Sequence, residues 1–292
     1  MLYEHHDTRS FALTTTQSRR KARLRRRRGR RAAFAVLLAL LVAAVLFALM
    51  LSVDSVFSLP QTAHTISNVP YLSQRDGFET GCESVSAAML LNDCGFDVTV
   101  DEFIDAYLPL GDAPYTDETG RWLGCDPWEA FPGDPRTPDG WGCYSTVIEG
   151  AMNRCLAGSG RRAKRLSGVP LDELCAEYID RDQPVLIWAT IDMEPPVTGI
   201  TWTVPETRRE ITWIYPMHCL VLIGYDADSY IFNDPWAGEC AAYDKESVEL
   251  AYTTLYEQAI GLPGYTKSAR QAICSALCHS VFTGIPRRFR HS

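Results

Sequence analysis

Cys82 and His218 are the two residues of this 292-residue sequence best suited to act together on a carbonyl group. A thiol attacks as the thiolate, so it needs a base that takes its proton and a further group that orients the base. After the membrane segment predicted below, four histidines are candidates, namely His64, His218, His279 and His291. Only His218 begins a strongly apolar, strand-like run. We therefore interpret Cys82 and His218 as nucleophile and base, against the plainer interpretation that each is a buried core residue.

Asp234 is the candidate for the group that orients His218. Two apolar runs, 218–225 and 230–235, flank the turn residues 226–229 and predict a β-hairpin. A carboxylate at the end of the second run can hold the imidazole in one tautomer. Pairing Tyr225 with Tyr230 sets Asp234 across from Val221, about three residues or ~10 Å short of His218. A bulge, strand twist or sideways reach must close this gap. Asn233 is the alternative, but it should point to the other face.

The segment Thr80–Leu91 predicts a short loop and then a buried helix that begins at Cys82. Good helix formers follow the cysteine, Glu83 complements the positive end of the helix dipole, and Gly95 marks the stop. A thiol at a helix N-terminus is shifted toward the thiolate, whereas negative charge on Glu83 opposes that shift. Gln74 lies eight residues before Cys82, where a loop that folds back can place it beside the sulfur.

The order of predicted elements indicates an α+β domain with helices first and an antiparallel sheet after them. Helical spacing or composition marks residues 100–108, 144–156, 170–180 and 245–259, and β-rich runs mark residues 185–191, 200–204 and 211–214. Between them, residues 109–143 are rich in Pro, Gly, Asp and Trp and show little periodicity. We interpret this long loop as one wall of a cleft. Its aromatic residues either contact a substrate or pin the loop to the core, and they are Trp122, Trp128, Phe131 and Trp141.

The N-terminal part differs sharply from the rest in charge. Residues 1–53 carry eleven Lys/Arg and two acidic residues, whereas residues 54–292 carry seventeen and thirty-four, a net charge of −17. The arginine-rich run ends at residue 31. Residues 32–53 follow it and contain only one polar residue, so this segment is long and apolar enough for a transmembrane helix. The positive-inside rule puts residues 1–31 in the cytoplasm and the remainder outside. A cleaved export signal is the competing interpretation.

These features predict further boundaries and exclude one class of partner. Residues 54–67 form a stalk, residues 68–262 form the main domain, and residues 263–292 form a basic C-terminal extension. The acidic main body offers no surface for nucleic acid.

All ten cysteines follow residue 80, as expected for a domain in an oxidising compartment. Cys82 must be a free thiol if it is the nucleophile, and Cys219 fits a buried strand position. The other eight are enough for four disulfides, or several of them are buried thiols. Cys274 and Cys278 share a helix face but lack a matching pair of zinc ligands. We expect neither a metal nor a cofactor.

Four short motifs, in order, carry a resemblance to a known family. They are Asn68-Val69-Pro70-Tyr71-Leu72-Ser73-Gln74, Thr80-Gly81-Cys82-Glu83-Ser84-Val85-Ser86, His218-Cys219-Leu220-Val221-Leu222-Ile223-Gly224-Tyr225-Asp226, and Asn233-Asp234-Pro235. Together, over about residues 66–262, they resemble the C39-like cysteine peptidase family.

The resemblance implies a papain-like fold and assigns roles to individual residues. Cys82 is then the nucleophile, His218 the base and Asp234 its orienter, while the Gln74 side chain and the Cys82 backbone N–H stabilise the oxyanion. Trp236 is similar to the tryptophan that covers the histidine–carboxyl contact in papain-like enzymes. The implied activity is that of a cysteine peptidase. Together with the span predicted above, it leads us to expect a membrane-anchored, extracytoplasmic peptidase acting on peptides.

Two features separate this chain from the family branch that processes leader peptides within ABC exporters. The sequence contains no P-loop and only one predicted span, so that activity is not carried over. Two alternatives remain open. The domain is an amidase or endopeptidase acting on the peptides of peptidoglycan, or it is a surface-binding module without turnover.

Overall fold

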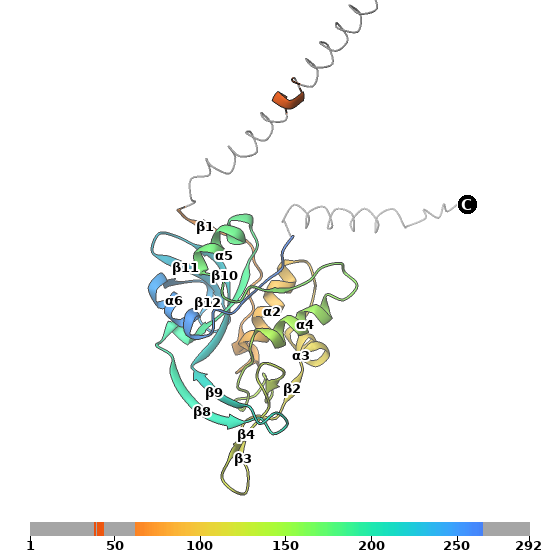
Figure 1. Ribbon diagram of the computed structural model, residues 1–292, viewed down its shortest axis with the longest axis vertical. Coiled ribbons are helices and arrows are strands. Elements are labelled where there is room, and N and C mark those ends of the chain that lie inside the picture. Colours follow the sequence, from red (N-terminus) through yellow and green to blue (C-terminus); the bar gives the residue numbers. More distant parts are fainter. Residues whose placement is uncertain (1–37, 39, 44–61, 265–292) are drawn as a thin grey trace, which may run out of the picture. The chain divides into compact units, whose positions relative to one another are not determined.

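The computed structural model describes residues 38, 40–43 and 62–264, and the chain divides into two units, residues 1–61 and 62–292. Within these described residues no helix combines the length and the apolar character needed to cross a bilayer. The predicted span 32–53 lies largely outside them, as do the basic N-terminus and the C-terminal extension beyond residue 264. The second unit contains all the elements discussed below (Figure 1).

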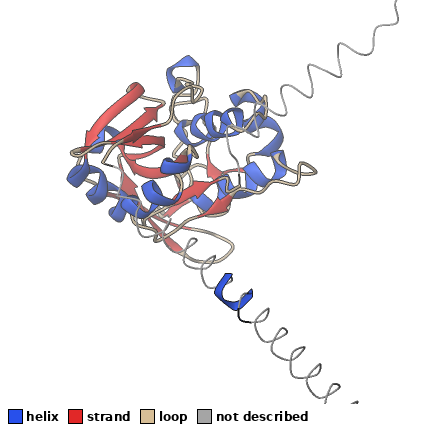
Figure 2. Ribbon diagram, turned by 90° about the horizontal axis from the view of Figure 1, so that it is seen from above, coloured by secondary structure: helices blue, strands red, loops and turns tan. Residues whose placement is uncertain are grey.

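A seven-stranded antiparallel sheet forms the centre of this unit. Its strands follow the order β12-β11-β10-β7-β13-β6, and β1 also pairs with β10. The strands are β1 (His64–Thr65), β6 (Lys164–Arg165), β7 (Val185–Thr190), β10 (Met217–Tyr225), β11 (Ser229–Asp234), β12 (Gly238–Asp244) and β13 (Ala259–Gly261). Every residue of β7 and β10 is buried, because helices cover both sides of the sheet (Figure 1, Figure 2). The predicted antiparallel sheet that follows helices is confirmed.

A one-residue bulge in β10 sets the register of the predicted hairpin. Tyr225 pairs with Tyr230, as predicted, but the register shifts between Leu222 and Gly224, so that Val221 pairs with Asn233. Directly paired residues share a face of the sheet, and side chains alternate between faces. Asn233 therefore shares the face of Val221, whereas Asp234 shares the face of His218. Without the bulge, Asp234 would be opposite Val221 and on the wrong face.

Strand β1 extends the sheet with residues that the sequence assigned to the stalk. His64 pairs with Tyr225 and Thr65 with Gly224, and the backbone N–H of Ile66 donates to the carbonyl of Ile223 at 2.8 Å. The Ile66 side chain is buried in the core. Residues 64–66 thus belong to the main unit, because main-chain pairing and apolar burial both hold them against β10.

The helices agree closely with the predicted segments. They are α2 (Cys82–Asp93), α3 (Val100–Tyr107), α4 (Ser145–Cys155), α5 (Leu171–Glu177) and α6 (Lys245–Thr254), with 3-10 turns η1 (Gln74–Asp76), η2 (Ile179–Arg181) and η3 (Ile191–Met193). Asn92 is the only residue of α2 that is not buried. Small residues let α2 approach the sheet closely, and the Ser86 hydroxyl donates to the Cys219 carbonyl at 3.0 Å. The helix ends at Asp93, and Gly95 follows at φ +83°, as predicted.

The Pro- and Trp-rich segment 109–143 contains short strands instead of helices. Strands β3 (Tyr115–Thr116) and β4 (Trp122–Leu123) join β8 (Val197–Thr203) and β9 (Glu210–Tyr215) in a second sheet, while β2 (Leu110–Gly111) pairs with β5 (Phe131–Pro132). The sequence missed β12 and β13. It also extended the last helix to Ala259, although α6 ends at Thr254. Ala259 to Gly261 instead form β13, whose pairing with β7 and β6 only the tertiary structure supplies.

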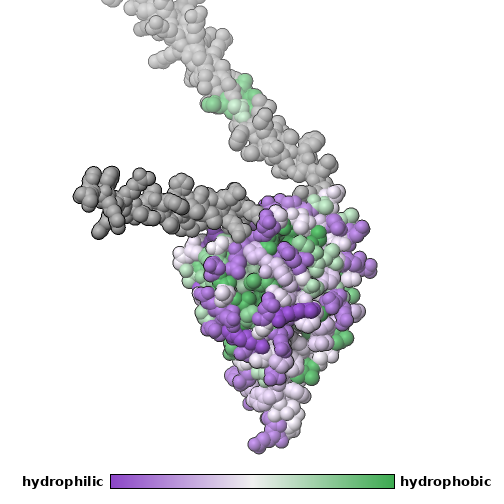
Figure 3. Space-filling view, turned by 180° about the vertical axis from the view of Figure 1, so that it is seen from behind, coloured by the Kyte–Doolittle hydropathy of each residue, from purple (hydrophilic) through white to green (hydrophobic). Residues whose placement is uncertain are grey.

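Polar side chains dominate the outer surface of this unit on the face shown in Figure 3, with smaller apolar areas between them. This distribution agrees with the acidic composition of residues 54–292 and with a core made from the buried faces of the sheet and of α2.

We predict that Gly224→Ala destabilises the fold by about 1–3 kcal/mol. A Cβ at Gly224 would lie 2.7 Å from the His64 carbonyl oxygen and 2.9 Å from the Thr65 Cα, so β1 would have to move. Gly150→Ala is the control, because a Cβ in the interior of α4 meets nothing closer than 3.6 Å and should stabilise by up to ~1 kcal/mol. Urea unfolding of the purified variants measures both. Equal effects of the two substitutions would contradict the packing of β1 on β10.

Candidate active site

The best-defined polar contact in the interior joins His218 and Asp234. His218 Nε2 lies 2.8 Å from Asp234 Oδ1, and both residues are 1% exposed. Burial alone would raise the pKa of Asp234, but hydrogen bonds from His218, from the Tyr243 hydroxyl at 2.7 Å and from the Trp236 N–H lower it to about 2. The carboxylate is therefore ionised at neutral pH and accepts the Nε2 proton.

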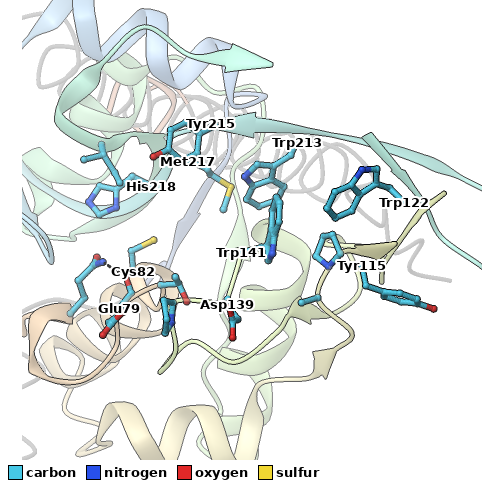
Figure 4. A pocket seen from close by; sticks show the side chains of 17 residues that line it. Glu79, Cys82, Tyr115, Trp122, Asp139, Trp141, Trp213, Tyr215, Met217 and His218 are labelled. Carbon is cyan, nitrogen blue, oxygen red and sulfur yellow. Dashed lines mark hydrogen bonds between the residues drawn. The ribbon is translucent and has the colours of Figure 1, made fainter. Parts of the chain in front are cut away.

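The other ring nitrogen of His218 is left as an acceptor. Nδ1 is buried and has no hydrogen-bond partner among the residues that the structure describes. Because Asp234 holds the proton on Nε2, the lone pair of the neutral ring sits on Nδ1. His218 lines the same cleft as Cys82 (Figure 4). The ring can thus act as a base toward a group in that cleft.

Cys82 is the first residue of α2, and its thiol reaches the cleft although the residue is only 6% exposed. Its Sγ donates to Glu83 Oε2 at 3.3 Å. Burial raises the pKa of the Cys82 thiol well above its ordinary value, and the neighbouring Glu83 and Cys219 raise it further. This differs from the sequence-based expectation of a lowered pKa. The reason is that loss of water around the sulfur outweighs the partial charge of a helix end.

Gln74 stands beside Cys82 because the chain folds back through η1. The Gln74 backbone N–H donates to the Pro235 carbonyl at 3.0 Å, which ties this turn to the residue directly after Asp234. The side chain is buried, lines the cleft and donates from Nε2 to the Glu79 carbonyl at 3.2 Å. Since the amide carries a second Nε2 hydrogen, it retains one donor for a ligand. The structure therefore brings Gln74, Cys82 and His218 to one cleft, with Asp234 behind the histidine.

The cleft has a volume of about 810 Å³, and its far end is aromatic. Cys82, His218 and Gln74 lie at one end. The aromatic side chains that line the remainder, all labelled in Figure 4, are Tyr115, Trp122, Trp141, Trp213 and Tyr215. Glu79 and Asp139 are the two carboxylates among the described lining residues, and no Lys or Arg stands with them.

Of the four aromatic residues predicted as possible substrate contacts, two line the cleft and two pack against the core. Trp122 and Trp141 line the cleft. Phe131 is fully buried, and Trp128 packs on Tyr144 with ring centroids 4.3 Å apart, so these two hold the loop to the core.

The sequence analysis missed the aromatic residues that β9 contributes to the cleft. Trp213 and Tyr215 alternate along β9 and therefore point to one face, a period-two signal that was treated only as a mark of a strand.

The contacts of Asn233 and Trp236 involve the main chain, Asp234 and Arg75. The Asn233 side chain donates to the Val69 carbonyl at 3.2 Å, on the face opposite His218, as predicted. The Trp236 backbone N–H donates to Asp234 at 2.8 Å, whereas its indole ring packs under the Arg75 guanidinium at 4.4 Å. Trp236 thus supports the carboxylate through its main chain.

The alternative of buried thiols, rather than disulfides, describes the cysteines better. Cys82, Cys125, Cys143, Cys155, Cys175, Cys219 and Cys240 are all unbridged. Cys143 and Cys219 are fully buried, and burial raises the pKa of both thiols, so they act as small core residues. Cys274 and Cys278 lie outside the described residues.

Comparisons with known proteins agree with this arrangement. Residues 66–260 match the model of the Peptidase_C39 like family. The chain is 30% identical over 181 residues to the uncharacterised protein YvpB of Bacillus subtilis (strain 168), covering 62% of this chain and 68% of that protein. It is also similar to a crystal structure of a protein from Bacillus anthracis described as a candidate C39-like peptidase, with a TM-score of 0.61 and 26% identity, covering 70% of this chain and 100% of that one. The protein therefore belongs to the Peptidase_C39 like family.

Proposed function

We propose that this protein is a cysteine peptidase of papain-like fold that hydrolyses peptide bonds through Cys82, His218 and Asp234. The observation that supports this best is the buried bond from His218 Nε2 to Asp234 Oδ1, which leaves Nδ1 as an acceptor on the wall of the cleft that holds the thiol. A histidine that only stabilised the core would have both ring nitrogens bonded or exposed to water.

In the proposed mechanism, Nδ1 of His218 takes the proton of the Cys82 thiol as the sulfur attacks the substrate carbonyl. The free Nε2 hydrogen of Gln74 and the backbone N–H of Cys82 stabilise the oxyanion. The imidazolium then gives its proton to the leaving amine, and a water molecule, deprotonated by the same ring, hydrolyses the thioester and restores the thiol. Asp234 remains a carboxylate throughout and stabilises the imidazolium. The raised thiol pKa implies that proton transfer accompanies attack instead of preceding it in the free enzyme.

We propose further that the catalytic unit works outside the cytoplasm on a single-pass anchor formed by residues 32–53. The arginine-rich residues before this segment and the acidic body after it support that orientation. The acidic cleft lining, without Lys or Arg among its described residues, favours peptides that are neutral or basic near the scissile bond.

Digestion of a peptide library by the purified protein tests the proposed activity. We expect cleavage by the wild type and a loss of at least 1000-fold in kcat/KM for Cys82→Ser, since a hydroxyl of much higher pKa replaces the thiol. A small iodoacetamide probe should label Cys82 in the wild type. Cleavage of muropeptides but not of library peptides would instead identify a peptidoglycan hydrolase. If neither substrate is cut and labelling is the same in both proteins, the domain is a binding module.

Asp234→Asn should lower kcat by about 100-fold or more at neutral pH while the protein stays folded. The amide oxygen can keep the bonds from His218 and from the Trp236 and Ala237 N–H groups, and its nitrogen can donate to the Tyr243 hydroxyl, so only the charge is lost. Tyr243→Phe is the control. It removes a single hydrogen bond from the carboxylate and should cost less than about tenfold. Steady-state kinetics measure both, and equal losses would argue against electrostatic support of His218.

Deletion of residues 32–53 should move the protein from the membrane fraction to the soluble fraction, because this segment is the only predicted span. Deletion of residues 2–18 is the matched control and should leave the protein in the membrane. Protease added to intact cells should digest the anchored catalytic unit. A mature chain that begins after residue 53 would contradict the anchor and identify a cleaved export signal.

A further inference from the structure

Glu83 occupies an unusual position for an acidic residue. It directly follows Cys82 in the first turn of α2, yet its side chain is fully buried. The carboxyl group lies between two partners. Oε1 accepts from the Cys143 backbone N–H at 2.7 Å, and Oε2 lies 3.3 Å from Cys82 Sγ. A carboxyl group thus lies within hydrogen-bond distance of the sulfur.

No cation neutralises Glu83 within the described part of the chain. None of the ion pairs between described residues includes it. The titratable groups that act on it or feel its charge come from α2, from the segment before α4 and from β10, and they are Cys82, Cys143, Tyr144, His218 and Cys219. Burial raises the pKa of Glu83, although the Cys143 N–H, its own backbone N–H, the Cys82 thiol and the nearby His218 act in the opposite direction. A buried carboxylate without a cation is costly, so the neutral acid is the favoured form.

The geometry also decides which oxygen carries the proton. Oε1 already accepts a short bond from the Cys143 N–H, which leaves Oε2 as the hydroxyl oxygen. Gly142 makes this contact possible. At this position, with φ +108°, a Cβ would lie 2.6 Å from Oε1 and would displace the carboxyl group. The backbone before α4 therefore fixes the carboxyl with Oε2 directed at the sulfur.

We propose that Glu83 works as a neutral carboxylic acid whose Oε2 hydroxyl donates a hydrogen bond to the Cys82 thiolate. When the thiol proton goes to Nδ1 of His218, the contact in which the thiol donates to Oε2 reverses its direction. The Glu83 proton stays on Oε2 and is donated to the sulfur as negative charge develops there. An ionised Glu83 would repel the thiolate at 3.3 Å instead. This inference rests on the proposed role of Cys82 as nucleophile.

Two substitutions separate the roles that Glu83 could have. Glu83→Gln stays neutral and keeps both a donor for sulfur and an acceptor for the Cys143 N–H, so we expect kcat/KM within about threefold of wild type. Glu83→Met is neutral and fills the space but donates nothing, so we expect a loss of about tenfold or more. A loss of at least 100-fold in Glu83→Gln would show that the negative charge is needed, and full activity of Glu83→Met would show mere packing. Either result overturns the proposal.

Titration of the thiolate by its ultraviolet absorbance supplies a readout independent of substrate. The apparent pKa of the Cys82 thiol should rise by at least one unit in Glu83→Met relative to the wild type, and should stay close to wild type in Glu83→Gln. The absorbance of Cys82→Ser is subtracted, because the other cysteines also titrate. Glu79→Gln removes one negative charge from the exposed rim of the same cleft and is the charge control, which should not raise the thiol pKa. An equal thiol pKa in Glu83→Met and the wild type would overturn the proposal.

Carbon-13 NMR of wild-type protein with labelled glutamate carboxyl groups decides the protonation state even if a variant fails to fold. A raised pKa means that Glu83 keeps its proton as the pH rises past the range in which ordinary glutamates ionise. We therefore expect one glutamate carboxyl signal to remain in the protonated position at neutral pH. Full ionisation of all glutamates would overturn the proposal. If the wild type cleaves no peptide, the proposed function fails, while the NMR and thiol titrations still decide the state of Glu83.

Discussion

The buried hydrogen bond between His218 and Asp234 depends on a single extra residue in β10. Side chains of a strand alternate between two faces, so an error of one residue in register moves a side chain to the opposite side of the sheet. The register shift between Leu222 and Gly224 places the Asp234 side chain on the same face of the sheet as His218. The two side chains then meet as diagonal neighbours on one face, where a carboxylate and an imidazole can bridge the distance. The ionised Asp234, which accepts four hydrogen bonds, in turn leaves the His218 ring with one acceptor atom, Nδ1.

The electrostatics of the cleft follow from the absence of strong cations among its described lining residues. Burial raises the pKa of Cys82 and of Glu83 alike, so both tend to hold their protons in the free protein. The helix N-terminus contributes only a fraction of a charge, which does not offset the loss of water around a buried thiol. In the proposed mechanism, proton transfer to His218 is therefore tied to substrate attack. A neutral Glu83 removes the repulsion that a carboxylate beside the sulfur would cause.

The substrate cleft is assembled from segments that are distant along the chain. The loop between α3 and α4 supplies Trp122 and Trp141, and the β8–β9 hairpin supplies Trp213. The rings of Trp141 and Trp213 meet edge to face with centroids 5.9 Å apart. Aromatic packing of this kind adds to the main-chain bonds that hold the loop, such as the one from the Trp141 N–H to the Pro132 carbonyl. The wall that faces Cys82 and His218 is therefore held by both kinds of contact, although much of it is not regular secondary structure.

The amino-acid sequence by itself determined most of the longer elements and indicated the candidate site residues. Helical periodicity and stop signals located α2 and α3, and β-rich runs located β7, β10 and β11, because these are local patterns with strong preferences. The order of Gln74, Cys82, His218 and Asp234 was enough to indicate the family. The short strands β1 and β13 were not predicted, since their stability comes from pairing with partners far away in the sequence, and β12 was also missed.

Tertiary structure alone decided how those residues work. The register of Asp234, the raised pKa of Cys82 and the burial of Glu83 against the Cys143 N–H all depend on which groups surround an atom and on how much water remains near it. A local sequence pattern specifies neither the groups that surround an atom nor the water that remains near it. Composition and spacing state which side chains are present, whereas desolvation and strand register, which set their charge and direction, arise only when the chain has packed.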